Sequence, residues 1–187
     1  MKTLLAYATR YGATAGTSEE IAKMLREEGF DVKVVNAKEE KIQDISEYEL
    51  IIVGGGMQMG KCTGETEDFL KNFQKELAQK KVAIFISSAM KSLFEREGKT
   101  EDLEKTRKTC LDDKAAKYSL QPIAVGLFGG VIDYNKMGLI TRKAMGSMKT
   151  RFEAAGFKET KPGVYDTRDW DEIREWARKL VLKARYF

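Results

Sequence analysis

The sequence predicts an α/β protein built on a doubly wound parallel sheet with helices on both faces. Five short apolar runs recur along the 187 residues, and helical patterns separate them. The loops that follow three of these runs are rich in glycine and hydroxyl side chains. Because the strands of a parallel sheet are covered on both faces, they read as continuous apolar runs rather than as alternating ones.

The expected strands are spread along most of the chain. The first, residues 2–8, is an apolar run that leads into a glycine-containing loop, which is typical of a buried strand. The others cover residues 31–37, 49–55, 82–88 and 122–130. Since no internal repeat, linker or low-complexity stretch divides the chain, we expect a single domain over residues 1–187.

Helical spacing lies between and after these strands. A capping-box pattern from Thr17 to Glu20 predicts the start of the first helix, and Gly29 predicts its end. Further helices are predicted over residues 69–77, 103–111, about 136–155 and 170–185. Right-handed crossovers through such helices place the strands in one sheet, whose ligands bind at the carboxyl ends of the strands.

The composition removes several classes of function. The chain has no histidine, so it contains neither a Ser-His-Asp triad nor a histidine-ligated zinc. Its net charge of +4 is too mild to predict nucleic-acid binding, although it favours an anionic ligand or membrane surface. The cysteines are too far apart for a C-x-x-C pair. We therefore expect reduced thiols in a cytoplasmic protein, with Cys62 accessible and without a partner and Cys110 in the core.

The stretch GGGMQMGKCT, residues 54–63, comes close to a nucleotide-binding P-loop. Gly55, Gly60 and Lys61 match the spacing, but Cys62 stands where Mg²⁺ needs a Ser or Thr hydroxyl. The fourth and fifth expected strands also end without the acid that would hold the metal. These two independent failures argue against an ATPase.

The loop after the first strand is the better anion site. Thr9, Thr14, Thr17 and Ser18 supply hydroxyls, and glycines let backbone N–H groups turn inward ahead of a helix. Such a loop suits a phosphate monoester without a metal or a histidine. A simple turn followed by a helix cap explains the same residues equally well.

Several stretches of the sequence resemble flavodoxin-like proteins. They are YATRYGAT with the SEEIAKMLREEGFDVKVVNA that follows, YELIIVGGGMQMGK, KVAIFISSAM and VGLFGGVIDYNKMG, in the order of the family. With the ending YDTRDWDEIREWA, the whole pattern is most similar to the flavodoxin-type protoporphyrinogen oxidase branch. The resemblance implies a flavodoxin-like five-stranded parallel sheet in the order 2-1-3-4-5, with FMN at the strand ends.

The resemblance also implies which residues hold the FMN. The phosphate would be held by Thr9, Arg10, Tyr11, Gly12, Ala13 and Thr14, with Thr17 and Ser18 as further donors. The flavin ring would lie between two loops, which consist of Gly56, Met57, Gln58, Met59, Gly60 and Lys61 and of Ser87, Ser88, Ala89 and Met90. Glycine permits close backbone approach, methionine offers polarizable contacts, and Lys61 favours an anionic reduced flavin. Ordinary packing explains the methionines as well.

The sequence departs from the family pattern at two points, and its phosphate loop can be aligned with the family motif in two registers. Tyr11 stands where a hydroxyl-bearing aliphatic residue is usual, so its backbone N–H is expected to make the contact. About one helical turn of extra residues precedes Ile21, so a register ending in Gly16-Thr17-Ser18-Glu19 fits as well as one ending in Gly12-Ala13-Thr14. We favour the register that ends at Thr14.

The resemblance leaves three functions open. An FMN oxidoreductase similar to protoporphyrinogen oxidase would pass two electrons from a porphyrinogen to a quinone or another acceptor. An electron-carrier flavodoxin would serve a redox partner protein. Such carriers are typically acidic and often stack an aromatic residue on the flavin, whereas this chain is basic and has none in its third-strand loop. A flavin-free binding domain would keep the fold alone.

The segment NKMGLITRKAMGSMKTRF admits two interpretations. Its apolar residues Met137, Ile140, Ala144, Met148 and Phe152 share one helical face, which predicts a helix that covers the sheet. Its basic residues instead favour a surface that meets a porphyrin carboxylate, a quinone or an anionic membrane. In the second interpretation the protein is cytoplasmic and contacts the inner face of the membrane peripherally.

Overall fold

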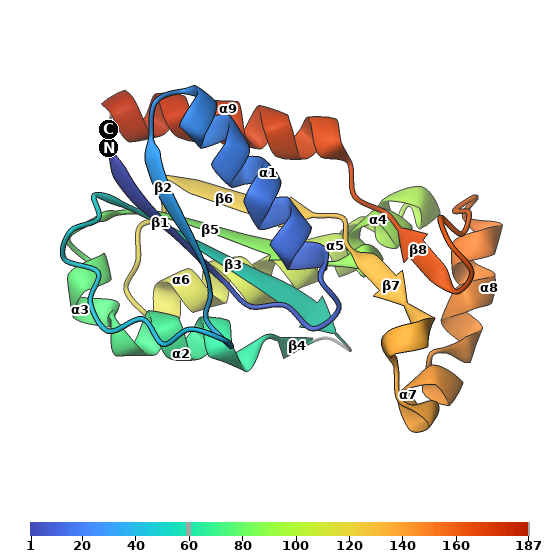
Figure 1. The fold of residues 1–187 in the computed structure, drawn as a ribbon. Coiled ribbons are helices and arrows are strands. Elements are labelled where there is room, and N and C mark those ends of the chain that lie inside the picture. The colour runs from blue at the N-terminus through green and yellow to red at the C-terminus, as the bar shows by residue number, and fades with distance from the viewer. Residues whose placement is uncertain (59–60, 187) are drawn as a thin grey trace.

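The computed structural model describes residues 1–58 and 61–186. Its centre is a parallel sheet in which the strands run in the order β2-β1-β3-β5-β6 (Figure 1). These strands are β1 (Lys2–Tyr7), β2 (Asp31–Asn36), β3 (Leu50–Gln58), β5 (Lys81–Ser87) and β6 (Ala124–Phe128). The predicted doubly wound sheet is confirmed, since the five predicted strands occur in the order 2-1-3-4-5.

The strands bury both of their faces. Along β3, Leu50 and Ile52 face one side of the sheet while Ile51 and Val53 face the other, because successive side chains of a strand alternate. All four are 2% exposed or less. Burying one such side chain contributes about 1.5–3 kcal/mol, which explains why residues 50–53 of this central strand are all apolar.

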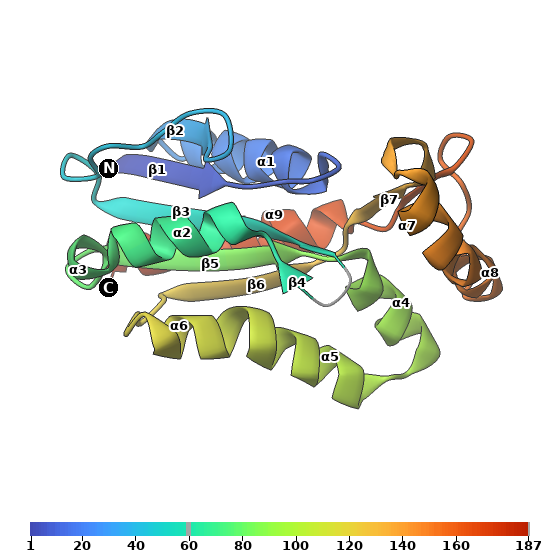
Figure 2. The same ribbon diagram turned by 90° about the horizontal axis from the view of Figure 1, so that it is seen from below.

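Helices form a layer on each face of the sheet (Figures 1 and 2). One layer consists of α1 (Ala13–Glu27) and α9 (Trp170–Tyr186), which pack against each other. The other consists of α2 (Gly64–Asn72), α3 (Gln74–Leu77), α5 (Thr100–Arg107), the π-helical turn η1 (Lys108–Asp112) and α6 (Asp113–Lys117). The apolar core is therefore divided into two clusters, one on each side of the strands.

Further elements lie beyond the carboxyl ends of the strands, at the right of Figure 1. Helix α4 (Ala89–Glu97) follows β5 directly. The others, which we call the distal lobe, are β7 (Val131–Asp133), η2 (Tyr134–Lys136), α7 (Leu139–Ala144), α8 (Gly146–Ala154) and β8 (Val164–Asp166). Strands β7 and β8 pair antiparallel. Tyr165 of β8 and Phe152 of α8 are buried together in a third apolar cluster.

A short strand, β4 (Lys61–Cys62), folds back on the end of β3. It places Cys62 opposite Met57, so the last part of β3 forms a hairpin that extends beyond the sheet. The backbone N–H of Thr63 then donates to the Gly56 carbonyl at 3.0 Å. Strand β3 therefore extends beyond the predicted run of residues 49–55, because β4 pairs with its last residues where the parallel sheet has ended.

Three helix predictions differ from the structure. Helix α1 begins at Ala13, four residues before the predicted start, because Gly12 (φ 92°) adopts the left-handed conformation that ends the preceding loop. Ala89 and Met90, expected in a loop with Ser87 and Ser88, instead begin helix α4. The helix predicted over 136–155 is interrupted at Met145, next to the helix-weakening Gly146. Among the described residues, no helix has the length and apolarity that a bilayer crossing requires.

Candidate cofactor site

A cavity opens where the carboxyl ends of β1, β3 and β5 meet the start of α4. Its volume is about 620 Å³ when the open mouth is included. Part of its wall consists of residues that the sequence predicts: Thr9, Arg10, Tyr11, Ala13, Thr14, Gly56, Met57, Ser87, Ser88, Ala89 and Met90. The structure therefore brings the three predicted loops together around one cavity.

The remaining predicted residues lie elsewhere. Gly12 caps the start of α1, and Lys61 is exposed on β4. Thr17 and Ser18 are buried one turn further along α1. Met59, Gly60 and the side chain of Gln58 fall outside the described residues.

The chain after β6 supplies wall residues that sequence reasoning missed, namely Gly130, Val131, Ile132, Met137 and Met145. The signal for them was the Gly129-Gly130 pair at the end of the fifth predicted strand, at the same edge of the sheet as the other loops. A Cβ at Gly130 would lie 2.7 Å from the backbone nitrogen of Ala89. Glycine is needed here because the chain passes so close to the start of α4.

The loop after β1 closes on itself before α1 begins. The hydroxyl of Thr9 accepts a hydrogen bond from the backbone N–H of Gly12 at 3.0 Å. The first intrahelical bond then runs from the N–H of Gly16 to the carbonyl of Gly12. In any α-helix the N–H groups of the first turn have no intrahelical acceptor and form the positive end of the dipole. The start of α1, beside the cavity, is therefore suited to an anion.

Buried hydroxyls without partners show that this region fits a polar ligand. Among the described residues, the hydroxyls of Thr14, Thr17, Ser18 and Ser87 are buried and accept or donate no hydrogen bond. Each such group costs about 1–3 kcal/mol, and native structures rarely leave one unexplained. Thr14 and Ser87 both line the cavity, so one polar ligand in it could satisfy two of the four.

The two phosphate-loop registers lie in different surroundings. The residues Gly12-Ala13-Thr14 form the junction between the loop and α1, where Ala13 and Thr14 line the cavity. The alternative, residues 16–19, lies within α1. A Cβ at Gly16 would collide with the guanidinium of Arg168, which stacks on Trp170 at 4.4 Å. In the second register, Gly16 therefore lies against Arg168 and Trp170 at the start of α9 rather than at the cavity.

The region next to Ser88 is held in place by hydrogen bonds between distant segments. The Thr167 hydroxyl accepts from the N–H of Gly130 at 3.1 Å and donates to its carbonyl at 3.0 Å. The Ser92 hydroxyl donates to the Thr167 carbonyl at 2.8 Å. The Ser88 N–H donates to the Phe128 carbonyl at 2.9 Å. These bonds hold the chain after β6 against α4.

Helix α4 is further fastened to α9 by a buried lysine. Lys91 is 7% exposed and donates to both carboxylate oxygens of Glu172 at 2.8 Å. It also pairs with Glu95 at 3.0 Å. Burial by itself lowers the pKa of Lys91, but hydrogen bonds to Glu172 and Glu95 outweigh it and raise the pKa above its ordinary value. Lys91 is therefore charged at neutral pH and lies one residue away from the wall residue Met90.

A second groove adjoins the cavity between α4, α5 and the distal lobe. It shares Met57, Met90 and Met145 with the cavity and adds Phe94 and Met148. The rest of its wall comes from α5 and η1 and consists of Asp102, Lys105, Thr106 and Thr109. Methionine side chains are flexible and polarizable, so this groove can accommodate flat apolar molecules.

The distal lobe corrects the prediction that its segment forms one helix over the sheet. Met137 and Phe152 are buried in the third apolar cluster, away from the sheet. Ile140, predicted on the same buried face, is 88% exposed, and its neighbour Leu139 is 83% exposed. The buried phenol of Tyr134 donates to the Met145 carbonyl at 3.2 Å, and its burial raises its pKa. Contacts within the lobe therefore replace the expected contact with the sheet.

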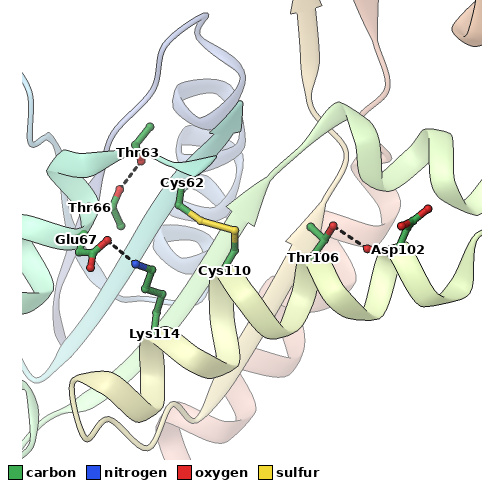
Figure 3. Close-up of a disulfide and its surroundings, with 8 residues drawn as sticks. All are labelled: Cys62, Thr63, Thr66, Glu67, Asp102, Thr106, Cys110 and Lys114. Carbon is green, nitrogen blue, oxygen red and sulfur yellow. Dashed lines mark hydrogen bonds and ion pairs between the residues drawn. A yellow bond between two sulfur atoms is a disulfide. The ribbon is translucent and has the colours of Figure 1, made fainter. Parts of the chain in front are cut away.

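The two cysteines are joined, so the prediction of reduced thiols is wrong. A disulfide links Cys62 of β4 to Cys110 of η1 (Figure 3). Their Cα atoms are 6.3 Å apart, within the range of about 4.4–6.8 Å that a disulfide spans. Cys110 lies in the core as predicted, at 3% exposure. The pairing was missed because 48 residues separate the cysteines and only the packing of η1 against the sheet brings them together.

Comparisons with known proteins agree with this architecture. A family profile described as a flavodoxin domain matches residues 4–159. No curated protein matches the sequence. A solved flavodoxin from the domain Archaea is 16% identical, with a TM-score of 0.58 over 100% of both chains. Flavodoxin 1 from Bacillus cereus is 17% identical, with a TM-score of 0.51 over 82% of this chain and 98% of its own.

A third structure is a short-chain flavodoxin associated with a PDU bacterial microcompartment. It is 14% identical, with a TM-score of 0.58 over 98% of this chain and 99% of its own. At such identities the solved structures show a shared α/β fold. Proteins of the flavodoxin family bind FMN. Since the family profile covers most of the sequence and the strand order agrees, the chain belongs to the flavodoxin domain family.

Proposed function

We propose that this chain binds FMN in the cavity at the strand ends and acts as a redox protein through it. The loop from Thr9 to Thr14 and the start of α1 would hold the phosphate. The flavin ring would lie between Met57 and the Ser87–Met90 segment. The bound flavin supplies the electron transfer, so the chain needs no catalytic histidine. The chain's own residues bind the cofactor, orient it and limit its contact with water.

The observation that carries this proposal is that the buried hydroxyls of Thr14 and Ser87, in one cavity wall, have no hydrogen-bond partner within residues 1–58 and 61–186. They come from two different elements, and the N-terminus of α1 adds its positive dipole at the same place. Gly56 leaves space beside them, because a Cβ there would lie 3.2 Å from the Thr14 hydroxyl oxygen. A phosphorylated ligand with further polar groups fits this set of donors.

We further propose that the protein is an oxidoreductase with its own apolar substrate, similar to protoporphyrinogen oxidase. The groove that shares Met57, Met90 and Met145 with the cavity supports this, because it gives a flat apolar molecule access to the flavin. Lys105 in its wall offers a cation to a substrate carboxylate. A porphyrinogen would be the electron donor and a quinone the acceptor. The absence of an aromatic residue in the third-strand loop supports the same view, since a carrier often covers its flavin there.

The second candidate is an electron carrier that exchanges electrons with a redox partner protein. Membership of the flavodoxin domain family and the flavodoxins among the solved structures favour it. A carrier needs an accessible flavin edge and a protein docking surface but no substrate groove. The two candidates therefore differ in whether the methionine-lined groove is used.

FMN titration followed by anaerobic turnover tests these proposals. We expect the purified chain to bind one FMN, and protoporphyrinogen to reduce that flavin, which a quinone then reoxidises. A flavin that exchanges electrons with other redox proteins but not with protoporphyrinogen would identify the carrier. A colourless protein that takes up no FMN would contradict both and leave a flavin-free binding domain.

We also propose that the protein is cytoplasmic and contacts an anionic membrane through the distal lobe. The exposed Leu139 and Ile140 project from α7, and Arg142 and Lys143 are exposed on the same helix. Apolar side chains flanked by cations are typical of helices that lie in a membrane interface. Sedimentation with vesicles tests this, since vesicles with anionic lipid should bind the chain and neutral vesicles should not. Replacing Leu139 and Ile140 by Ser should abolish that binding, and an unchanged bound fraction would contradict the proposal.

A further inference from the structure

The Cys62–Cys110 disulfide ties the wall of the cavity to the helices on one face of the sheet. Cys62 lies opposite Met57 in the β3–β4 hairpin, and Met57 lines the cavity. Cys110 lies in η1, a π-helical turn between α5 and α6. Isolated π-helical turns are rare and occur frequently at functional sites. One covalent bond thus joins the hairpin beside the proposed flavin to an irregular turn of the helix layer (Figure 3).

The two sulfur atoms differ in how a reagent can reach them. Cys62 is half-buried, whereas Cys110 is 3% exposed. An external thiolate would therefore attack the sulfur of Cys62 and displace that of Cys110. Lys114, which pairs with Glu67, lines the same small cavity as both cysteines (Figure 3). Glu67 lines this cavity too, so the two opposite charges offset each other beside the disulfide.

We propose that Cys62–Cys110 is a thiol–disulfide exchange site through which a dithiol reductant weakens the hold of the cavity on FMN. One thiolate of the dithiol bonds to the sulfur of Cys62, and Cys110 leaves as a thiolate and takes up a proton. The second thiol then attacks this mixed disulfide and releases Cys62 as a thiol. Two electrons and two protons pass to the chain, and the dithiol becomes a disulfide. The effect on FMN rests on the proposed function, whereas the exchange itself does not.

The hydrogen bonds around the hairpin explain why reduction would alter the cavity without unfolding the chain. The base of the hairpin stays tied to α2, because the Thr63 and Thr66 hydroxyls are 2.7 Å apart and the Thr63 N–H bonds to Gly56. The disulfide adds a covalent restraint at Cys62, the residue that lies opposite Met57. Its loss removes this restraint on the strand opposite Met57, so the Met57 side chain must be ordered when FMN binds. Ordering one such side chain weakens binding by about 3- to 10-fold.

The compartment gives such a site a role. Disulfides in cytoplasmic proteins are usually transient and either catalytic or redox-sensing, because cellular thiols reduce them. In the cytoplasm proposed above, the bond would form when dithiol reductants are depleted and break when they are restored. The chain would then hold its flavin most tightly under oxidising conditions.

The test compares the purified chain before and after treatment with dithiothreitol, a small dithiol, under native conditions. Alkylation followed by mass measurement should show no modified cysteine before treatment and two after it. FMN titration should give a dissociation constant about 3- to 10-fold higher for the reduced chain. A variant that combines Cys62→Ser with Cys110→Ser should match the reduced chain and should not respond to dithiothreitol.

The outcomes separate the two proposals. Two alkylated cysteines before treatment, or none after it, would overturn the exchange site. Equal FMN affinities of the oxidised and reduced chain would overturn its effect on the cavity. If neither form binds FMN, the proposed function fails, and the exchange site is decided by alkylation alone. Because dithiothreitol acts on the unmodified sequence, the result does not depend on whether the double variant folds.

Discussion

Two regions of this molecule bury polar side chains in opposite ways. Glu67 of α2 is partly buried and Lys91 of α4 is buried, and each lies in a cluster of ion pairs and hydrogen bonds. At the cavity, the buried hydroxyls of Thr14 and Ser87 have no partner within the part of the chain that the structure describes. Both arrangements remove polar atoms from water, but only the first replaces what water supplied.

This difference indicates what each region is for. Buried polar groups that have partners within the chain stabilise the folded state. Removing one partner leaves the other buried without a hydrogen bond, which destabilises the fold. Buried hydroxyls without partners cost stability in the free chain, and a ligand that satisfies them recovers it. We therefore expect substitutions in the ion-pair clusters to change stability alone. Substitutions of the cavity hydroxyls should change FMN binding alone.

The largest effect is expected for Lys91→Met. Removing the ammonium leaves Glu172 without its partner, and because that side chain is 37% exposed, solvent screening limits the loss of unfolding free energy to about 2–3 kcal/mol. Denaturant unfolding of the FMN-free chain measures this, and the affinity for FMN should stay within twofold. The matched control is Lys179→Met, because Lys179 is 67% exposed and its pair with Glu175 contributes little. A large loss of FMN affinity in Lys91→Met would break the comparison, since it would show that α4 does not act as a rigid support.

The next effect is expected for Thr14→Val, which replaces a hydroxyl by a methyl group of similar size. A hydrogen bond to a charged phosphate is worth about 1.5–3 kcal/mol, so FMN should bind about 10- to 100-fold more weakly. The free chain should be as stable as the unmodified one or more so, because the lost hydroxyl had no partner among the described residues. Titration and unfolding of the same preparation measure both quantities.

Thr3→Val is the control for this substitution. Thr3 is also fully buried, but it lies in β1 at the opposite end of the sheet, where its hydroxyl donates to the Met1 carbonyl. We expect its FMN affinity to be unchanged. Equal affinities of Thr14→Val and the unmodified chain would contradict the placement of the phosphate at the loop that ends in Thr14.

The sheet was predictable because its strands depend on local patterns. Ile51, Ile52 and their neighbours form a run that only a strand covered on both faces explains, and this is independent of distant contacts. Helix α4 was not predictable in this way. Its Lys91 reads as a solvent-exposed residue, and the carboxylate that permits its burial, Glu172, lies 81 residues away. Sequence patterns do not report such long-range pairing.

The site was predictable where it follows directly from strand ends. Thr14 and Ser87 lie just after β1 and at the end of β5, so the topology alone brings them to one edge of the sheet. Met137 and Met145 reach the cavity from the distal lobe, whose path depends on the packing of Phe152 and Tyr165. The disulfide likewise depends on where η1 packs. Residues placed by tertiary contacts were therefore the ones that sequence reasoning missed.

A smaller effect, which depends on pH, is expected for Glu67→Gln. Hydrogen bonds from Lys114 and Lys117, with one from the Tyr118 phenol, lower the pKa of Glu67 to about 2. Since this lies below the unfolded value, the carboxylate stabilises the fold fully above about pH 5, and the contribution is lost as pH falls towards 2. At 31% exposure of its side chain, solvent screening limits it to about 1–2 kcal/mol.

Unfolding of the two chains at pH 7 and at pH 3 measures this contribution. The unmodified chain should be more stable than Glu67→Gln by about 1–2 kcal/mol at pH 7, and the gap should narrow at pH 3. FMN affinity at pH 7 should be equal in both. A gap that stays constant with pH would show that the cluster acts through shape rather than through the charge of Glu67.

The smallest effect is expected for Ser87→Ala and Ser92→Ala. This pair tests the comparison most directly, because one serine has a hydrogen-bond partner among the described residues and the other has none. Both serines are buried near the same cavity, but Ser92 donates to the Thr167 carbonyl and Ser87 has no partner among the described residues. A neutral hydrogen bond is worth about 1 kcal/mol, or about fivefold in affinity. Ser87→Ala should therefore bind FMN about fivefold more weakly at unchanged stability, while Ser92→Ala should lose about 1 kcal/mol of stability at unchanged affinity. If the two variants lose the same quantity, the lack of a partner in the free chain does not identify a ligand contact, and the assignment of the cavity to FMN loses its main support.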